Sequence, residues 1–246
     1  MLRVFTSGGL GDAAMAYAKM DKILVPFTVT HAEPHKEVLS VISEFYSSQG
    51  IEAEVVFPPR GTKIFYRKYQ AEFDLTFGSP WHGRGSFPKD DYEINPFPKI
   101  KFTPIPFTDI VIQVSAGKDM SRGIPPQHII QFARKYPERK ISLVGRAPSD
   151  YEEVNEPNIE SFVNLTLMNQ FISLICSAQL FIGAAGFGAY IACMAGVKSF
   201  IVPEYCNNFR LGSQGFNLES RDYISGNYLH PSRPYTLISS ISEISL

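Results

Sequence analysis

A long uncharged segment places the strongest constraint on this chain. From Ser161 to Val197 the sequence contains no Asp, Glu, Lys, Arg or His. Such a segment either crosses a membrane or lies inside a folded core, and the part from Leu174 onward is long enough to cross a bilayer. Glycines interrupt it at Gly183, Gly186 and Gly188, a pattern typical of a helix, a short strand, a turn and a second helix. We therefore expect the interior of an α/β domain and no transmembrane segment.

The composition agrees with a globular protein. A chain of 246 residues has the length of one large domain or two small ones, at roughly 100–200 residues per domain. Hydrophobic residues make up 44% and charged residues 19%, which argues against disorder. The net charge of −1 provides no global field that would attract nucleic acid. The N-terminus lacks an export signal and the three cysteines form no CxxC pair, so we expect a cytoplasmic protein.

Short apolar runs alternate with helical patterns along the chain. Strands are predicted at 2–6, 23–29, 51–57 and 73–77, and helices at 11–20, 36–48 and 64–72. The alternation restarts with strands at 109–115, 140–144, 159–163, 180–182 and 198–202, and with helices at 125–136, 167–177, 188–195 and a last short one at 235–244. This order predicts parallel sheets covered by helices on both faces.

A proline-rich segment separates the two halves. Six of the 18 prolines lie from Pro80 to Pro106, where no periodicity is seen, as in a linker or a functional loop. We predict an N-terminal domain at 1–107, with a Pro-rich loop at 79–107, and a C-terminal domain at 108–246. The predicted fold class is α/β, with two Rossmann-like domains facing across a cleft. A ligand in that cleft would lie at the carboxyl ends of the strands.

The first predicted strand ends in a glycine-rich turn that opens a helix, an arrangement that attracts anions. Gly9, Gly11 and Ala14 formally match the dinucleotide fingerprint G-x-G-x-x-A. The acidic residue expected about 20 positions later would be Glu33, which we place in a loop instead of at a strand end. Asp12 is either a general base that takes a proton from a hydroxyl or a cap of the helix, and the local sequence leaves both interpretations open.

A second candidate site follows the first strand of the second half. Ser115, Lys118 and Arg122 offer a hydroxyl and two cations just before a helix, which together suit a diphosphate. The order of residues is not that of a P-loop. The alternative is a solvated surface loop.

A third candidate site is the glycine turn inside the uncharged segment. Backbone amides of Gly183, Gly186 and Gly188 could hold a phosphate or a nucleotide, with Tyr190 as the first polar side chain beyond them. The alternative is close packing of a helix on the sheet.

Other polar residues have two interpretations each. Trp81, His82 and Arg84 lie between glycines of the central loop, where they either contact a sugar on the acceptor side or are a packed tryptophan with exposed neighbours. Glu204 follows the last clear strand and either binds a ribose or lies on the surface.

Two residue pairs have unsuitable spacing. Tyr136 and Lys140 have the Tyr-x-x-x-Lys spacing of short-chain dehydrogenases, but Pro137 prevents them from sharing a helical face. His31 and His35 are also separated by a proline, so we expect a surface loop instead of a metal pair.

Together, three features resemble the GT-B glycosyltransferases, and most closely the ADP-heptose:lipopolysaccharide heptosyltransferase family (glycosyltransferase family 9). They are the Gly-Asp turn after the first strand, the Ser-x-Gly-Lys…Arg…Pro-Pro sequence that opens the second half, and the strand, glycine turn and helix that end at Val197. The resemblance is best at 8–19 and 110–203, and is that of a distant or shortened member.

The resemblance assigns roles to individual residues. It implies that Asp12 is the general base and that Lys118 and Arg122, with Ser115 beside them, bind the nucleotide diphosphate. The family usually has an Asn-Asp-Ser-Gly-Pro-type sequence and a following His in its late glycine turn. Here the turn is Ala184-Ala185-Gly186-Phe187-Gly188, with Tyr190 where the His would be, so a nucleotide contact there is made by the backbone.

The resemblance implies an inverting glycosyltransferase. The enzyme would transfer a sugar from a nucleotide-diphosphate sugar to a hydroxyl of a glycan or glycolipid, without a metal or other cofactor and with at most peripheral membrane contact. The chain also has no Asp-x-Asp, the pattern of metal-dependent GT-A transferases. Two alternatives stay open: a non-catalytic nucleotide- or sugar-binding protein of the same fold, and an NAD(P)-binding Rossmann enzyme.

Overall fold

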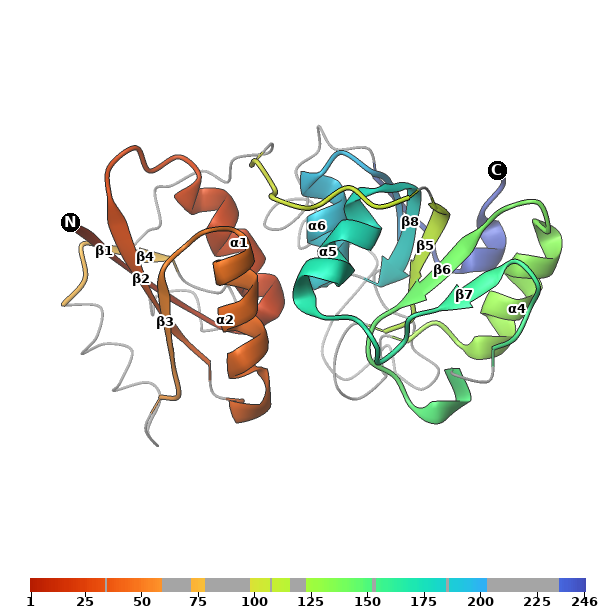
Figure 1. The fold of residues 1–246 in the computed structure, drawn as a ribbon, viewed down its shortest axis with the longest axis horizontal. Helices are drawn as coiled ribbons and strands as arrows, with labels where there is room; N and C mark the ends of the chain where they lie inside the picture. Colours follow the sequence, from red (N-terminus) through yellow and green to blue (C-terminus); the bar gives the residue numbers. More distant parts are fainter. Residues whose placement is uncertain are drawn as a thin grey trace. The chain divides into compact units, whose positions relative to one another are not determined.

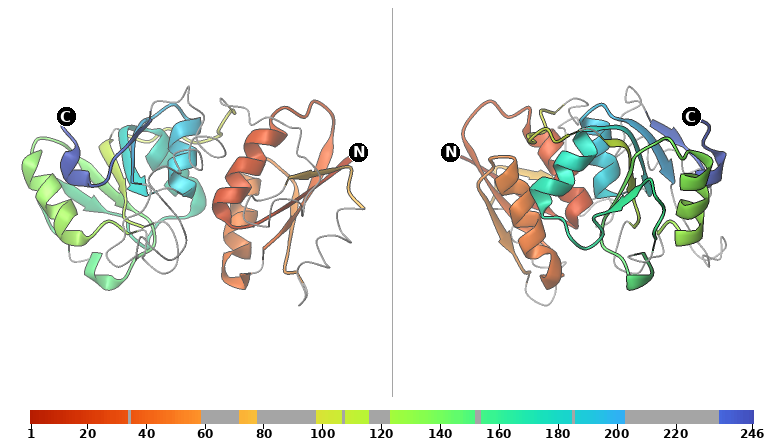
Figure 2. Two further views of the ribbon diagram at one scale, coloured as in Figure 1. Left: turned by 180° about the vertical axis from the view of Figure 1, so that it is seen from behind. Right: turned by 45° about the vertical axis from the view of Figure 1, so that its right-hand side comes forward.

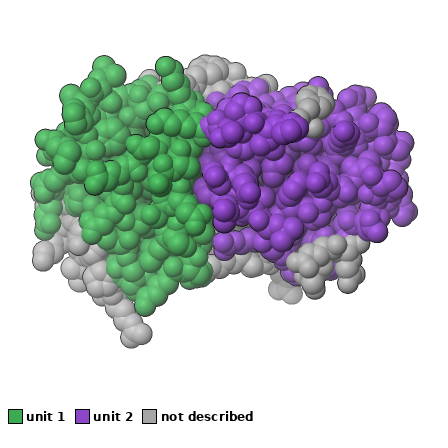
Figure 3. Space-filling view, viewed as in Figure 1, with its two compact units in different colours: residues 1–101 green, residues 102–246 purple. Residues whose placement is uncertain are grey.

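The chain forms two compact units, each with its own parallel sheet. The computed structural model describes residues 1–33, 35–58, 72–77, 98–106, 108–115, 123–151, 154–184, 186–202 and 235–246. Unit 1 is Met1–Lys101 and unit 2 is Phe102–Leu246, and Figure 3 shows them in different colours. The first described strand of unit 2 begins at Thr108.

Unit 1 contains a sheet of four described strands in the order β3-β2-β1-β4, all parallel (Figure 1). The strands are β1 (Leu2–Ser7), β2 (Phe27–Ala32), β3 (Ala53–Val56) and β4 (Leu75–Phe77), and the helices are α1 (Leu10–Met20) and α2 (Leu39–Ser48), with a 3-10 turn at Lys36–Val38. Helices α1 and α2 lie on the same face of the sheet. The order of strands reverses between β1 and β4, which makes their carboxyl ends a topological switch point.

Unit 2 contains a parallel sheet in the order β10-β9-β8-β5-β6-β7. Its strands are β5 (Thr108–Gln113), β6 (Ile141–Val144), β7 (Ile159–Ser161), β8 (Ala178–Ala184), β9 (Lys198–Val202) and β10 (Tyr235–Leu237), and its helices are α4 (Pro126–Lys135), α5 (Met168–Cys176) and α6 (Phe187–Met194), with 3-10 turns at Ser149–Tyr151 and Ile241–Glu243. Helix α4 covers one face, and α5 and α6 cover the other (Figures 1 and 2). The order reverses between β5 and β8.

The uncharged segment from Ser161 to Val197 forms α5, β8 and α6, which confirms the prediction of a helix, a strand and a second helix. Most residues of β8 and α6 are buried. Within the described ranges, each helix falls short of the length or the apolar character that crossing a bilayer needs.

Two predicted elements are wrong in detail. The second strand begins at Phe27 instead of residue 23, because Phe27 is the residue that pairs with Leu2. Leu24 and Val25 precede it with exposed fractions of 95% and 55%. The helix predicted at 235–244 is instead β10 followed by a 3-10 turn, since a short apolar run does not distinguish the two by its period. The helix predicted at 64–72 lies outside the described residues except for Glu72.

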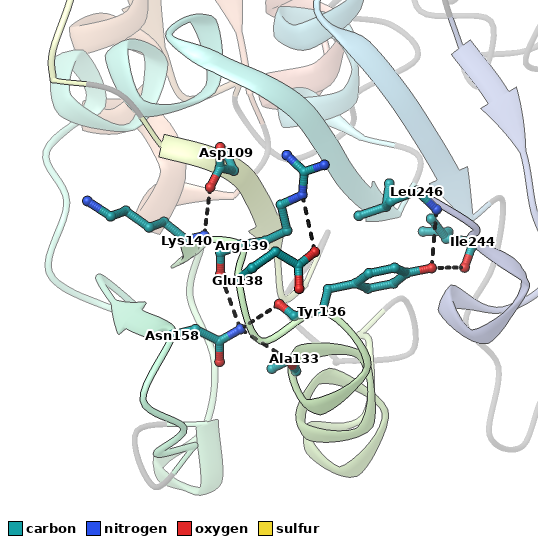
Figure 4. A network of polar contacts seen from close by, with 9 residues as sticks. All are labelled: Asp109, Ala133, Tyr136, Glu138, Arg139, Lys140, Asn158, Ile244 and Leu246. Atoms are coloured by element: carbon teal, nitrogen blue, oxygen red, sulfur yellow. Dashed lines mark hydrogen bonds and ion pairs between the residues drawn. The ribbon is translucent and has the colours of Figure 1, made fainter.

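The C-terminal segment is fastened to α4 (Figure 4). The hydroxyl of Tyr136 donates to the carbonyl of Ile244 at 2.8 Å. Lys135 Nζ donates to the same oxygen at 2.9 Å. The amide of Leu246 donates to the Tyr136 hydroxyl at 3.2 Å. Ile241 and Ile244 are buried in the core of unit 2. The Tyr136 hydroxyl therefore has a structural role, since both of these bonds hold the C-terminal segment.

The side-chain amide of Asn158 binds the chain just after α4. Asn158 Nδ2 donates to the carbonyls of Ala133, Tyr136 and Arg139 at 3.0–3.1 Å, which holds the turn that follows α4. The backbone amide of Lys140 donates to Asp109 Oδ2 at 2.8 Å, so the start of β6 is tied to β5.

Candidate functional site

The first candidate site lies at the switch point of unit 1, where β1 and β4 end side by side. Thr6 of β1 is the register partner of Phe77 of β4. A narrow depression at this point, which has no room for an enclosed water molecule, is lined by Thr6, Ser7, Asp12, Met15, Ala16, Lys19 and Phe77. Ser7 is fully buried, and its hydroxyl has no hydrogen-bond partner among the described residues. The depression therefore combines a buried hydroxyl with the Asp12 carboxylate.

Asp12 lies in the first turn of α1, and the structure shows its capping interaction. Its Oδ2 accepts a hydrogen bond from the amide of Gly9, the residue before the helix, at 2.9 Å. Gly8 has a φ of 115°, a conformation that favours glycine, and a Cβ there would overlap the Asp12 side chain. Gly11 lies within α1 itself. The turn thus packs directly against the carboxylate.

His31 occupies the interior of unit 1, so the predicted surface loop is wrong for this residue. It belongs to β2 and is fully buried. Its Nε2 bonds to the carbonyl of Gly8 at 2.8 Å and its Nδ1 to the hydroxyl of Tyr46 at 2.9 Å. Burial lowers the pKa of His31 from its ordinary value of 6.5 to about 4, against the opposing effect of the bond to Gly8. The sequence analysis missed this role because Gly8 and Tyr46 are both distant from His31 along the chain.

Glu33 directly follows β2, which corrects its placement in a loop away from a strand end. The shift arises because β2 begins and ends later than predicted. Glu33 is buried and its Oε1 accepts a hydrogen bond from the amide of His35 at 2.7 Å. A Cβ on Gly9 would lie 3.9 Å from both Glu33 Oε2 and Asp12 Oδ2, so two carboxylates flank Gly9.

The second candidate site lies at the switch point of unit 2. Ser115, just beyond β5, is buried, and its hydroxyl donates to the carbonyl of Arg146 after β6. Ser115 also forms an isolated antiparallel bridge with Gly123, which precedes α4. The structure therefore ties Ser115 to two neighbouring loops, and this hydroxyl is held by the protein itself.

The glycine turn after β8 shows the close packing that the sequence left as an alternative. A Cβ on Gly188 would overlap Gln113 Oε1, and one on Gly183 would lie 3.1 Å from Gln113 Cβ. Gly186 precedes the first residue of α6, and Tyr190 is buried within that helix. A side chain at Gly183 would also overlap the Phe181 ring, so both Gly183 and Gly188 are required for packing.

Gln113 is a residue of this site that the sequence analysis missed. It ends β5 and is buried, and its Nε2 donates to the carbonyl of Ser115 at 2.8 Å. Its Oε1 has no hydrogen-bond partner among the described residues. The available signal was a polar side chain at the end of an otherwise apolar strand.

The remaining predicted site residues lie outside the described part of the chain. They are Trp81, His82 and Arg84 on the proposed acceptor side, and Lys118, Arg122 and Glu204 on the proposed nucleotide side. Among the residues that the structure describes, no group of three or more His, Cys, Asp or Glu side chains could hold a metal ion.

Comparisons with known proteins identify the fold. No protein-family model matches the chain, and no curated protein matches its sequence. Among solved structures, ADP-heptose LPS heptosyltransferase II of E. coli matches with a TM-score of 0.59 at 9% identity, over 97% of this chain and 90% of that one. The glycosyl transferase family 9 protein of Veillonella parvula has a TM-score of 0.55 at 11% identity, over 96% of this chain and 85% of that one. E. coli heptosyltransferase WaaC with ADP has a TM-score of 0.52 at 11% identity, over 82% of this chain and 87% of that one. The chain has the fold of these GT-B glycosyltransferases, as its motifs predicted.

The packing of Gly188 against Gln113 can be tested by suppression. We expect Gly188→Ala to lower the free energy of unfolding by about 1–3 kcal/mol, because the added methyl overlaps the amide of Gln113. In a Gln113→Ala background the same substitution should cost much less, since the space is vacated. Denaturant unfolding of the four proteins measures the coupling. Equal costs in both backgrounds would refute the packing role.

The buried neutral state of His31 predicts a pH dependence. In the unfolded chain His31 binds a proton below its ordinary pKa of 6.5, whereas in the folded protein it binds one only below about pH 4. The free energy of unfolding should therefore fall as the pH falls from 6.5 to 4, by up to about 3 kcal/mol. We expect this component to be missing in His31→Gln. Far-UV circular dichroism in denaturant can follow unfolding; parallel pH curves for both proteins would contradict the prediction.

Proposed function

We propose that this chain is a glycosyltransferase that transfers a sugar from a nucleotide-diphosphate sugar to a hydroxyl of a glycan or glycolipid. The observation that carries the proposal is the Asp12 carboxylate at the switch-point depression of unit 1, in a chain with a heptosyltransferase fold. Matching structures are described with ADP and with ADP-2-deoxy-2-fluoro heptose, which supports this class of donor. The proposal places the protein in the cytoplasm, with only peripheral membrane contact.

In the proposed reaction Asp12 acts as the general base. Its carboxylate takes the proton of the acceptor hydroxyl while that oxygen forms a bond to the anomeric carbon of the donor. The bond from the anomeric carbon to the diphosphate oxygen breaks in the same step, and the electron pair leaves with the diphosphate. Direct displacement inverts the anomeric centre, and no metal or other cofactor takes part in the proposal.

The leaving diphosphate requires the larger electrostatic stabilisation. We assign this task to Lys118 and Arg122, and to the amides at the start of α6 around Gly186. A helix N-terminus and cations both favour a negative ligand. Ser115 contributes by holding the loops after β5 and β6 together, since its hydroxyl donates to Arg146. Trp81, His82 and Arg84 are proposed to contact the acceptor, Glu204 the ribose, and Tyr190 the nucleotide.

Two observations favour other functions. The late glycine turn, Ala184-Ala185-Gly186-Phe187-Gly188, has no polar side chain of its own, which favours a non-catalytic nucleotide- or sugar-binding protein. Glu33 at the end of β2 favours an NAD(P)-binding enzyme, because an acidic residue at that position binds the ribose in dinucleotide folds. Binding of a nucleotide sugar without turnover would identify the first alternative, and calorimetric titration with NAD and NADP tests the second.

Asp12→Asn separates the two roles of this residue. The asparagine oxygen still accepts the bond from Gly9, so the free energy of unfolding should change little. The amide cannot take a proton, and turnover should fall by roughly 10²–10⁴. Release of nucleoside diphosphate from a donor in the presence of an acceptor measures turnover.

Asp21→Asn is the matched control. Asp21 is exposed at the other end of α1, so this variant should keep full turnover. A loss of less than about tenfold in Asp12→Asn would exclude general-base catalysis by this residue.

A further inference from the structure

We propose that His31, together with Tyr46, is a positioning residue that fixes the location of the Asp12 carboxylate by holding the Gly8–Gly9 turn. The inference rests on the proposed function, in which Asp12 accepts the proton. His31 and Tyr46 do not line the depression at the switch point, so they act through the turn and not on a substrate.

The hydrogen bonds determine which nitrogen of His31 carries the proton. A backbone carbonyl only accepts, so Nε2 donates to Gly8 at 2.8 Å. In the neutral ring Nδ1 is then an acceptor, and the Tyr46 hydroxyl donates to it at 2.9 Å. Both side chains are fully buried. One tautomer and one ring orientation satisfy both bonds, which makes the ring a rigid link from α2 through β2 to Gly8.

The backbone of Gly8 is held to β2 on both sides. Its amide donates to the carbonyl of Ala32 at 3.1 Å, and its carbonyl accepts from the neighbouring His31. Glycine at this position can take its φ of 115° without strain, and the two bonds select this conformation from the many that glycine can adopt. The His31 bond therefore stabilises the one turn geometry that leads into α1.

The Gly8–Gly9 turn fixes the position of the Asp12 carboxylate. The amide of Gly9 donates to Asp12 Oδ2 at 2.9 Å, and the Cα of Gly8 packs so closely on Asp12 that a Cβ would overlap its side chain. A shift of the turn would carry the carboxylate with it. Proton transfer depends steeply on such geometry, because a displacement of about 1 Å can cost roughly a hundredfold in rate.

Three variants test this link. Tyr46→Phe removes the hydroxyl that orients the ring, His31→Leu removes the donor to Gly8, and His31→Gln keeps a side-chain donor at a similar reach. The matched control is Tyr17→Phe. Tyr17 is another buried tyrosine of unit 1, whose hydroxyl donates to the carbonyl of Lys99 at 2.5 Å, away from the turn. Circular dichroism establishes that each variant is folded, and Tyr46→Phe is informative even if His31→Leu is not.

The first readout is hydrogen exchange at the Gly9 amide, measured by NMR on the full chain. We expect Tyr46→Phe and His31→Leu to speed exchange by about tenfold or more, the effect of losing one buried hydrogen bond. His31→Gln should retain part of the protection, and Tyr17→Phe should retain all of it. Unchanged exchange in Tyr46→Phe and His31→Leu would overturn the proposal, whether or not the protein has transferase activity.

The second readout is the kinetics of sugar transfer. A positioning role predicts a fall in kcat of roughly tenfold to a hundredfold in Tyr46→Phe, with the KM for the donor unchanged, while Tyr17→Phe keeps both. Equal loss in the two tyrosine variants would indicate general destabilisation and overturn the proposal. A wild-type protein without turnover would refute the proposed function instead, and the exchange of the Gly9 amide would still decide whether His31 holds the turn.

Discussion

Parallel strand pairing is the constraint on which both candidate sites depend. All described strands in each sheet run in one direction, so their carboxyl ends meet at one edge. The order of strands reverses between β1 and β4 in unit 1 and between β5 and β8 in unit 2. Open α/β sheets bind ligands where the order reverses. Among the described candidate residues, Asp12 and Ser115 follow strands at these positions, and Gly183 lies near the end of β8.

The two interpretations of Asp12 are compatible. Its Oδ2 bonds to the Gly9 amide, which is the capping role, and the same carboxylate lines the depression at the switch point, which is the place a base needs. A cap holds a carboxylate in a fixed orientation, and a general base benefits from the same restriction. In the proposed reaction the cap would hold the base in place, and variants that keep one role while removing the other separate the two.

Local patterns predicted much of the fold. The strand at 198–202 is observed as predicted, and the helix predicted at 167–177 is Met168–Cys176, because each lies in a strongly patterned segment. The start of β2 was missed, since the apolar residues before Phe27 look like a strand until pairing with Leu2 decides the boundary. The GT-B fold was predicted from a family resemblance, carried by the Gly-Asp turn, the Ser-x-Gly-Lys…Arg…Pro-Pro sequence and the late glycine turn.

Contacts between residues distant in sequence could not be predicted in this way. The burial of His31 depends on Gly8 and Tyr46, which approach it only after β1, β2 and α2 have packed. The same holds for Gln113, whose side chain fills the space beside Gly188 on another element. The sequence around His31 and around Gln113 contains no signal for these contacts, which form only in the folded protein.

The central claim is that this chain catalyses sugar transfer from a nucleotide-diphosphate donor. The most direct measurement incubates the full chain with a panel of nucleotide sugars and glycan or glycolipid acceptors, and follows nucleoside diphosphate and glycosylated product together by mass spectrometry. The account predicts acceptor-dependent release of nucleoside diphosphate in equal amount to a product of inverted anomeric configuration. Binding of a nucleotide sugar with neither product across the panel would contradict it.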